Sequence, residues 1–360
     1  MQTFIVMTKI KNYYSFILSY CILFCACTHE PDFKITKEFA DSLKQYDDVG
    51  TFSEGLATMQ VGKKWGFIDK QGKQIIPCLY DITWHFSEGL AQVNVGEKWG
   101  FIDKTGKQVI PCLYDEVWFF REGLAPVNVG EKWGFIDKTG KQIIPCLYDK
   151  AWFFSEELAQ VNVGGKWGFI DKTGEQIIPC LYDITWHFSE GLAPVKVGEK
   201  WGFIDKAGKQ IIPCLYDFVY SFSEGLAIVK VGGKCGFIDR TGKQVIPCLY
   251  DDAWFFREGL AQVKVGGKYG FIDKTGKQII PCLYNKVDSF SEGLAKVKVG
   301  KKWGFINKTG EQIIPCLYDE VASFNEGLAK VYVGRIFLGN YAKSGFVDKY
   351  GNSTFDFDKK

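Results

Sequence analysis

The sequence is poor in the residues that most catalytic and metal sites require. Of its 360 residues only three are histidines, His29, His85 and His187. Lys and Arg total 44 against 42 Asp and Glu, so no overall field favours nucleic acid or an acidic partner. We find no Ser-His-Asp arrangement, paired-carboxylate pocket, phosphate-binding loop or nucleophile elbow in it. We therefore expect that the protein is not an enzyme and needs no cofactor.

The twelve cysteines do not form a disulfide or metal-binding pattern. Eight of them recur at one constant spacing, so each has two equivalent neighbours and no preferred partner. Metal sites favour Cys-x-x-Cys pairs or nearby histidines, which these cysteines lack. We interpret them as small buried side chains beside a turn. They are Cys78, Cys112, Cys146, Cys180, Cys214, Cys248, Cys282 and Cys316.

A single 34-residue unit fills most of the chain. The copy from Tyr80 to Leu113 reads YDITWHFSEGLAQVNVGEKWGFIDKTGKQVIPCL. A fixed period of this size is typical of a repeat array, because one such unit is too short to bury a core alone. Successive copies begin at Tyr46, Tyr80, Tyr114, Tyr148, Tyr182, Tyr216, Tyr250, Tyr284 and Tyr318.

Each unit has the alternating pattern of strands. In the second copy we predict strands over 90–95, 98–103 and 107–110, the last one ended by Pro111. The first strand alternates and is expected to be half-buried, whereas the second is apolar on both faces and needs cover from neighbouring units. Gly100, next to Trp99, has room for a bulky ring or another backbone. A proline and about four glycines per unit exclude helical repeats of the same length.

The motif Lys98–Asp103, KWGFID, with EGLA upstream at 88–91, closely resembles the WG (KWG) repeat family of bacteria. The resemblance extends from Tyr46 to about Gly351 and implies a β-rich array, often exported, with no reaction attached. Cys235, Tyr269 and Ser344 replace the tryptophan. Glu157 replaces the glycine of EGLA; since a positive φ would strain it, we infer that glycine is convenient there and not obligatory.

For the fold we expect an all-β chain of nine three-stranded antiparallel units in an open, superhelical, solenoid-like stack. The alternative is a closed, propeller-like ring in which the first and last units meet. The atypical ends, with a polar last strand over 352–357, favour the open form. The array occupies 46–360, and 28–45 is a linker with a short capping helix over 37–45.

The amino terminus resembles the signal peptide of a bacterial lipoprotein. Lys9 and Lys11 precede an apolar run from Tyr13 to Ala26, which is shorter than a membrane span. Cys27 follows the small residue Ala26 and is the expected lipidation site. We therefore predict a signal peptide over 1–27 and anchoring to the outer membrane, on either its periplasmic or its cell-surface side.

The copies differ most in the four residues between YD and the following phenylalanine. Six central units carry an aromatic stripe there, which the end units lack, and a second aromatic row lies beside it. If exposed, these rings suit sugars or an extended peptide, but they equally suit packing between units. The stripe comprises Trp84, Trp118, Trp152, Trp186, Tyr220 and Trp254, and the second row comprises His85, Phe119, Phe153, His187 and Phe255.

A second gradient follows the first predicted strand of each unit. Asn94, Asn128 and Asn162 give way to a row of lysines, which we interpret as solvated surface, with binding of an anionic partner as the alternative. The row comprises Lys196, Lys230, Lys264 and Lys298. As a whole, the sequence predicts a non-enzymatic scaffold that binds a partner protein, with glycan binding or a structural spacer role as alternatives.

Overall fold

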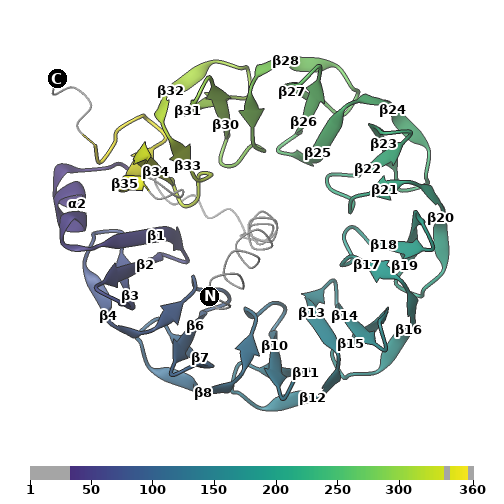
Figure 1. Ribbon diagram of the computed structural model, residues 1–360, viewed down its shortest axis with the longest axis horizontal. Helices are drawn as coiled ribbons and strands as arrows, with labels where there is room; N and C mark the ends of the chain where they lie inside the picture. Colours follow the sequence, from purple (N-terminus) through teal and green to yellow (C-terminus); the bar gives the residue numbers. More distant parts are fainter. Residues whose placement is uncertain (1–32, 336–340, 356–360) are drawn as a thin grey trace. The chain divides into compact units, whose positions relative to one another are not determined.

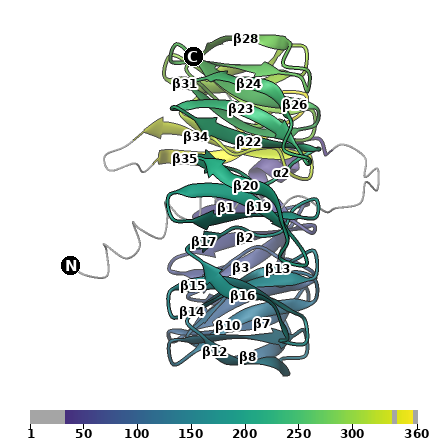
Figure 2. The ribbon, with the colours of Figure 1, turned by 90° about the vertical axis from the view of Figure 1, so that its right-hand side faces the viewer.

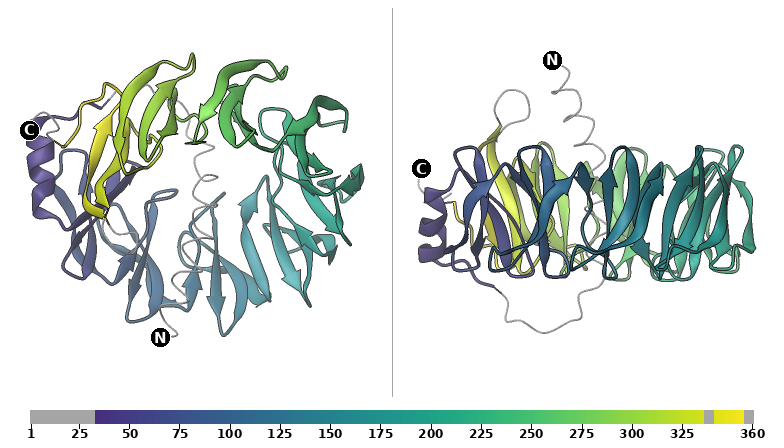
Figure 3. Two further views of the ribbon diagram at one scale, coloured as in Figure 1. Left: turned by 45° about the horizontal axis from the view of Figure 1, so that its top comes forward. Right: turned by 90° about the horizontal axis from the view of Figure 1, so that it is seen from below.

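Nine small antiparallel sheets, or blades, form a closed ring in the computed structural model (Figure 1). The structure describes residues 33–335 and 341–355, and side chains at 335–342 are left out. Blades 1 to 8 have four strands and blade 9 has three. Viewed from the side, the blades stand next to one another in one layer (Figures 2 and 3). The predicted open stack of three-stranded units is therefore wrong, and the arrangement is a nine-bladed β-propeller.

The first strand of each blade lies nearest the centre of the ring (Figure 1). In most blades it is only two residues long, too short for a sequence pattern, and sequence reasoning missed it. These strands are β1 (Asp48–Ser53), β5 (Ile82–Thr83), β9 (Glu116–Val117), β13 (Lys150–Ser155), β17 (Ile184–Thr185), β21 (Phe218–Val219), β25 (Asp252–Arg257), β29 (Lys286–Val287) and β33 (Glu320–Val321).

The second and third strands form the middle of each blade. In blade 2 they have the predicted bounds. The second strands are β2 (Leu56–Val61), β6 (Leu90–Val95), β10 (Leu124–Val129), β14 (Leu158–Val163), β18 (Leu192–Val197), β22 (Leu226–Val231), β26 (Leu260–Val265), β30 (Leu294–Val299) and β34 (Leu328–Arg335). The third strands are β3 (Lys64–Asp69), β7 (Lys98–Asp103), β11 (Lys132–Asp137), β15 (Lys166–Asp171), β19 (Lys200–Asp205), β23 (Lys234–Asp239), β27 (Lys268–Ile272), β31 (Lys302–Asn307) and β35 (Tyr341–Asp348).

The fourth strand forms the outer edge of the ring and leads into the next blade (Figure 1). It continues through the proline that was expected to end it, because an edge strand tolerates a residue without an N–H. These strands are β4 (Gln74–Tyr80), β8 (Gln108–Tyr114), β12 (Gln142–Tyr148), β16 (Gln176–Tyr182), β20 (Gln210–Tyr216), β24 (Gln244–Tyr250), β28 (Gln278–Tyr284) and β32 (Gln312–Tyr318).

The hydrophobic core lies between blades rather than within them. One cluster joins Leu56, Phe67 and Ile76 of blade 1 to Phe86 and Val93 of blade 2. Both faces of a blade are therefore covered, and residues 90–94 are all buried, so the prediction of a half-buried strand is wrong. The strand Lys98–Asp103 was predicted to need cover on both faces. This prediction is confirmed, because Gly100, Phe101 and Ile102 are buried.

The glycine of the WG motif is fixed by a close backbone approach. A Cβ atom on Gly100 would lie 2.4 Å from the carbonyl oxygen of Ile110 and 2.7 Å from the carbonyl carbon of Pro111. Real Cβ atoms do not come so close to backbone, so the fourth strand crosses the third only where a side chain is missing. The sequence interpretation of this glycine is confirmed.

Among its described residues blade 9 has only an isolated bridge in place of a fourth strand, and an amino-terminal helix packs on the turn of blade 1 instead. In blades 2 to 8, the isoleucine of the preceding fourth strand packs on the turn glycine, as Ile76 does on Gly106. In blade 1 the corresponding Gly72 instead faces Ser42 and Phe39. Ser42 and Phe39 belong to α2 (Lys37–Ser42), which continues into the 3-10 turn η1 (Leu43–Gln45).

The seam between blades 9 and 1 is closed by packing and polar contacts. Phe39, only 3% exposed, packs in one cluster with Phe52 of blade 1 and with Leu328 and Phe346 of blade 9. The Lys330 ammonium lies 2.7 Å from the Asp48 carboxylate. The atypical ends, taken as a sign of an open stack, therefore complement each other. Of the predicted closing strand over 352–357, the described residues form only an isolated bridge, in which Ser353 pairs with Val347.

A cyclic set of hydrogen bonds also passes through the seam. The Glu88 carboxylate accepts from the backbone N–H of Gly123 in the next blade, at 3.0 Å. The same contact links Glu326 of blade 9 to Gly55 of blade 1, at 3.1 Å. Lys138 and Lys70, from the following turn, pair with these two carboxylates. The junction between blades 9 and 1 therefore has the same hydrogen bond and ion pair as a junction between two internal blades.

Candidate functional site

An irregularity in the first strand directs side chains toward the centre of the ring. In β1, Val49 pairs with Met59 and Phe52 pairs with Ala57, so two residues lie opposite one. Blades 4 and 7 show the same shift. Such bulges interrupt the alternation of a strand and re-aim its side chains. The bulge positions are those where the copies differ most, occupied by Trp84 and His85 in blade 2.

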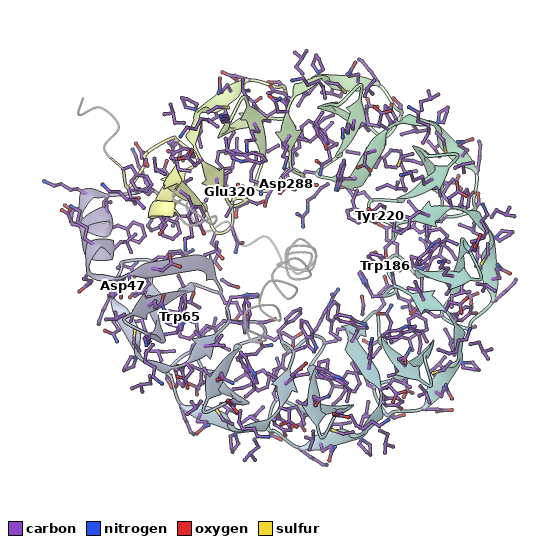
Figure 4. All side chains as sticks on the ribbon, viewed as in Figure 1. Asp47, Trp65, Trp186, Tyr220, Asp288 and Glu320 are labelled. Atoms are coloured by element: carbon purple, nitrogen blue, oxygen red, sulfur yellow. The ribbon has the colours of Figure 1, made fainter. Side chains whose placement is uncertain are left out.

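The predicted aromatic stripe lies on consecutive blades at the inner edge of the ring. Trp186 and Tyr220 point inward from blades 5 and 6 (Figure 4). We call the stripe and its second row together the aromatic arc. All its members are half-buried except Phe153, which is 6% exposed. The arc covers blades 2 to 7.

Rings of the arc contact one another across blade boundaries. Ring centroids are 5.4 Å apart for Trp118 and Trp152, and 6.2 Å apart for Trp186 and Tyr220. The arc therefore contributes to packing between blades while leaving part of its surface uncovered. The structure thus shows both packing between units and partly exposed rings, the two interpretations that the sequence left open. Ligand binding stays a prediction.

The second row brings both central histidines into one run of rings. Centroid distances are 6.3 Å from His85 to Phe119, 5.4 Å from Phe119 to Phe153 and 6.1 Å from Phe153 to His187. The Arg121 guanidinium lies 4.6 Å from the centre of the Phe153 ring. Burial, with a smaller effect of Arg121, lowers the pKa of His187 to about 3. Burial also lowers the pKa of His85.

The three blades outside the arc are adjacent only because the ring is closed. Their bulge positions hold small or polar residues, with Asp288 in blade 8, Ala322 in blade 9 and Gly50 in blade 1. Asp288 pairs with Lys296 at 2.6 Å. Asp288 and Glu320 lie at the inner edge of the ring (Figure 4). The sequence presented these blades as two separate ends, so this polar arc was missed.

The predicted lysine row is not simply solvated. Lys196, Lys230, Lys264 and Lys298 are half-buried at the end of the second strand. The asparagines at the same position in blades 2 to 4 are buried, with Asn94 6% exposed. The row thus lies within the ring wall, next to the first strands.

The repeated cysteines lie in the fourth strand and not beside a turn. All eight are half-buried free thiols. The Cys112 thiol lies 3.7 Å from the carbonyl oxygen of Val93 and 3.6 Å from the Gln108 amide nitrogen. Burial raises the pKa of Cys112. Over the described residues, no three His, Cys, Asp or Glu side chains come together as metal ligands would.

The glycine of EGLA has a positive φ, and so does Glu157, so glycine is not obligatory there but its replacement is strained. Gly89 has a φ of 85°, and Glu157 follows with 73°. Both residues of each of these two-residue hairpins have positive φ, as in a type I′ turn. Open space around the Cβ position, as at Gly123, explains why Glu157 is tolerated there.

Two predictions lie outside the described residues. They are the signal peptide over 1–27 with its lipidation site Cys27, and the first part of the linker, 28–32, with His29 just after Cys27. None of the helices in the described portion is long and apolar enough to cross a membrane.

Solved structures resemble this chain in fold alone. A eukaryotic initiation factor matches with a TM-score of 0.61 and 10% identity, covering 83% of this chain and 94% of that one. Two other structures match less well. Kluyveromyces lactis Hsv2 has a TM-score of 0.41 and 9% identity, covering 65% of this chain and 92% of that one. The dihydro-heme d1 dehydrogenase NirN has a TM-score of 0.42 and 13% identity, covering 71% of this chain and 69% of that one. No curated protein matches the chain.

The family comparison covers almost the whole ring. The "WG containing repeat" family matches nine segments in succession, namely 44–65, 65–99, 99–133, 133–167, 167–201, 201–235, 236–269, 269–303 and 303–335. The resemblance seen in the sequence is thereby confirmed, and this chain belongs to the WG repeat family.

Proposed function

We propose that the protein is a non-enzymatic scaffold that binds a partner protein at the inner edge of its ring. One observation carries the proposal: the copies diverge at the bulge, where side chains are re-aimed toward the centre, while strands and turns stay nearly constant. Variation confined to one edge of a rigid frame is typical of binding proteins. Half-buried tryptophans supply rigid contact area at low entropic cost.

Trp118 and Trp152 are the residues to change first, because they contact each other on neighbouring blades. A Trp118→Ala/Trp152→Ala variant should lose the protein that co-purifies with the wild type after cross-linking. Leu113→Ala/Leu147→Ala is the matched control, since both leucines are about two-thirds exposed at the outer edge of the ring, at 66% and 67%. If the inner-edge variant keeps the partner while the outer-edge variant loses it, binding is not at the inner edge.

Export and anchoring belong to the same proposal. A basic segment, an apolar run and Cys27 after Ala26 support a lipid anchor at the outer membrane. Mass spectrometry of the mature protein should find a lipidated Cys27 as its first residue. An unmodified Cys27, or a mature protein that begins elsewhere, would remove the anchor and leave the scaffold proposal intact.

Glycan binding is the second candidate, and the uncovered surface of the aromatic arc favours it. Sugar rings stack on flat aromatic faces, and the arc offers one such residue per blade over six consecutive blades. Alanine at Trp118, Trp152 and Trp186 should abolish glycan binding with little change in melting temperature. A large fall in melting temperature would show that the rings serve chiefly as packing between blades.

A further inference from the structure

The residue at the end of the second strand divides the aromatic arc into two halves. In blades 2 to 4 the residue at the end of the second strand is a buried asparagine, such as Asn162, which is 5% exposed. In blades 5 to 7 the same position holds a half-buried lysine. At this strand position the cations are confined to blades 5 to 7, which we call the cationic half, whereas in the other half Arg121 lies against the Phe153 ring.

Each lysine in the cationic half shares a neighbour with an arc ring. Lys264 lies 5.2 Å from the centre of the Tyr269 ring, and Trp254 contacts the same ring at 5.7 Å. In blade 5, Lys196 pairs across the strands with Trp201, whose ring is 6.5 Å from that of Trp186. One ammonium group and one aromatic ring therefore recur together on the same face of the blade.

In blade 6 the side chain shared by the lysine and the arc ring is a cysteine instead of an aromatic residue. Lys230 pairs across the strands with Cys235, and Tyr220 packs against the cluster that contains Cys235. The arc position is therefore accompanied by a lysine in each of blades 5, 6 and 7.

In the described part of the chain these lysines form no ion pair with a carboxylate, although Asp252 lies opposite Lys264 across the strands. Asp183 and Asp217, which feel the charges of Lys196 and Lys230, are hydrogen-bonded to Lys166 and Lys200 instead. A half-buried ammonium group without a partner is costly, and an anionic ligand would remove that cost.

We propose that blades 5 to 7 bind an acidic polysaccharide. Its sugar rings lie against Trp186, Tyr220 and Trp254, and its carboxylates meet Lys196, Lys230 and Lys264. One ring and one cation per blade match a polymer that carries one ring and one anion in each unit, which a peptide does not do regularly. The inference rests on the glycan-binding candidate above and adds the charge of the ligand.

Single-stranded nucleic acid has a similar pairing of ring and anion. Nucleic-acid-binding surfaces usually belong to strongly basic proteins, whereas this chain has 44 Lys and Arg against 42 Asp and Glu. The charge balance therefore favours the sugar polymer, and a single-stranded oligonucleotide becomes a necessary comparison.

Calorimetry with oligogalacturonate and its fully methyl-esterified form tests the proposal, because the two share their rings and differ in charge. The wild type should prefer the acidic form, and salt should weaken its binding. The Lys196→Asn/Lys230→Asn/Lys264→Asn variant, which copies the residues of blades 2 to 4, should bind the acidic form about tenfold less tightly. Its melting curve shows whether it is folded.

The matched control replaces three exposed lysines just before fourth strands, Lys107, Lys141 and Lys209, by asparagine, and it should bind like the wild type. Equal binding of both glycans overturns the charge inference but keeps the glycan-binding candidate. Binding of neither glycan overturns both. Tighter binding of the oligonucleotide than of oligogalacturonate assigns the surface to nucleic acid and also overturns the inference.

Discussion

Single residues in the first hairpin of each blade determine how well neighbouring blades are joined. Glu156 and Glu157 of blade 4 both have positive φ, at 54° and 73°, whereas every other blade has glycine at the second position. A side chain with positive φ costs about 1 kcal/mol or more. The exposed ion pair from Glu157 to Lys172, at 2.9 Å, offsets only part of this cost.

Replacing Glu157 by glycine should therefore stabilise the protein by about 0.5–1 kcal/mol. Thermal melting monitored by circular dichroism would show the increase. The opposite change, Gly123→Glu in blade 3, should lower the melting temperature. A lower melting temperature for Glu157→Gly would mean that the ion pair outweighs the backbone strain.

His187 makes the ring sensitive to acid. Its folded pKa of about 3 lies well below the value near 6.5 of an unfolded chain, so the folded state resists protonation. Stability is therefore complete above pH 6.5 and falls as the pH decreases toward 3, by up to about 2 kcal/mol at pH 5. His187→Phe, which copies Phe153 of the previous blade, should reduce the difference between melting temperatures at pH 7 and pH 5. An unchanged difference would show that other groups govern the acid response.

At the scale of elements, the strands with a periodic pattern could be predicted from the sequence, whereas the two-residue strands could not. The strands Leu90–Val95 and Lys98–Asp103 have their predicted bounds because alternation and turn residues define them. The two-residue strand Ile82–Thr83 has no pattern of its own and is formed by pairing with Asn94 and Val93. The aromatic residues of the arc were found by comparing copies, but their burial depends on the bulge and on the neighbouring blade, which no single unit reveals.

The crossing of the third and fourth strands should be intolerant of any side chain at the WG glycine. Gly100→Ala would place a Cβ 2.4 Å from the Ile110 carbonyl oxygen and should destabilise the protein by about 3 kcal/mol. Gly123→Ala is the control, since it meets no atom within 4 Å and should cost only about 1 kcal/mol through its φ of 85°. Chemical denaturation distinguishes the two variants. Equal effects would refute the steric explanation.

At the scale of the whole molecule, the chain ends determine whether the array is a ring or a stack. Local patterns in the repeat do not distinguish the two, because every internal junction would be the same in both. The decision depends on Phe39, Leu328 and Phe346, which are far apart in sequence and share one cluster. The sequence indicated a capping helix but not that it would pack on Gly72, where blades 2 to 8 have an isoleucine of the preceding fourth strand.

Removing the Phe39 side chain should loosen the seam specifically. Phe39→Ala should destabilise the protein by about 3–5 kcal/mol, because this ring is buried between the first and last blades. Hydrogen exchange should increase first in blades 1 and 9. Leu79→Ala, at a side chain that is 61% exposed, is the control and should change little. Faster exchange spread evenly over all blades would contradict a seam closed by this helix.

Zero-length cross-linking of carboxylates to amines tests the closed ring most directly. The Lys70 ammonium of blade 1 lies 3.2 Å from the Glu326 carboxylate of blade 9, and the equivalent internal pair, Lys104 and Glu54, is also 3.2 Å apart. Tandem mass spectrometry of the monomeric protein should find both pairs joined. In an open stack, Lys70 and Glu326 would lie at opposite ends of the array. A linked Lys104–Glu54 pair with no Lys70–Glu326 link would contradict the ring.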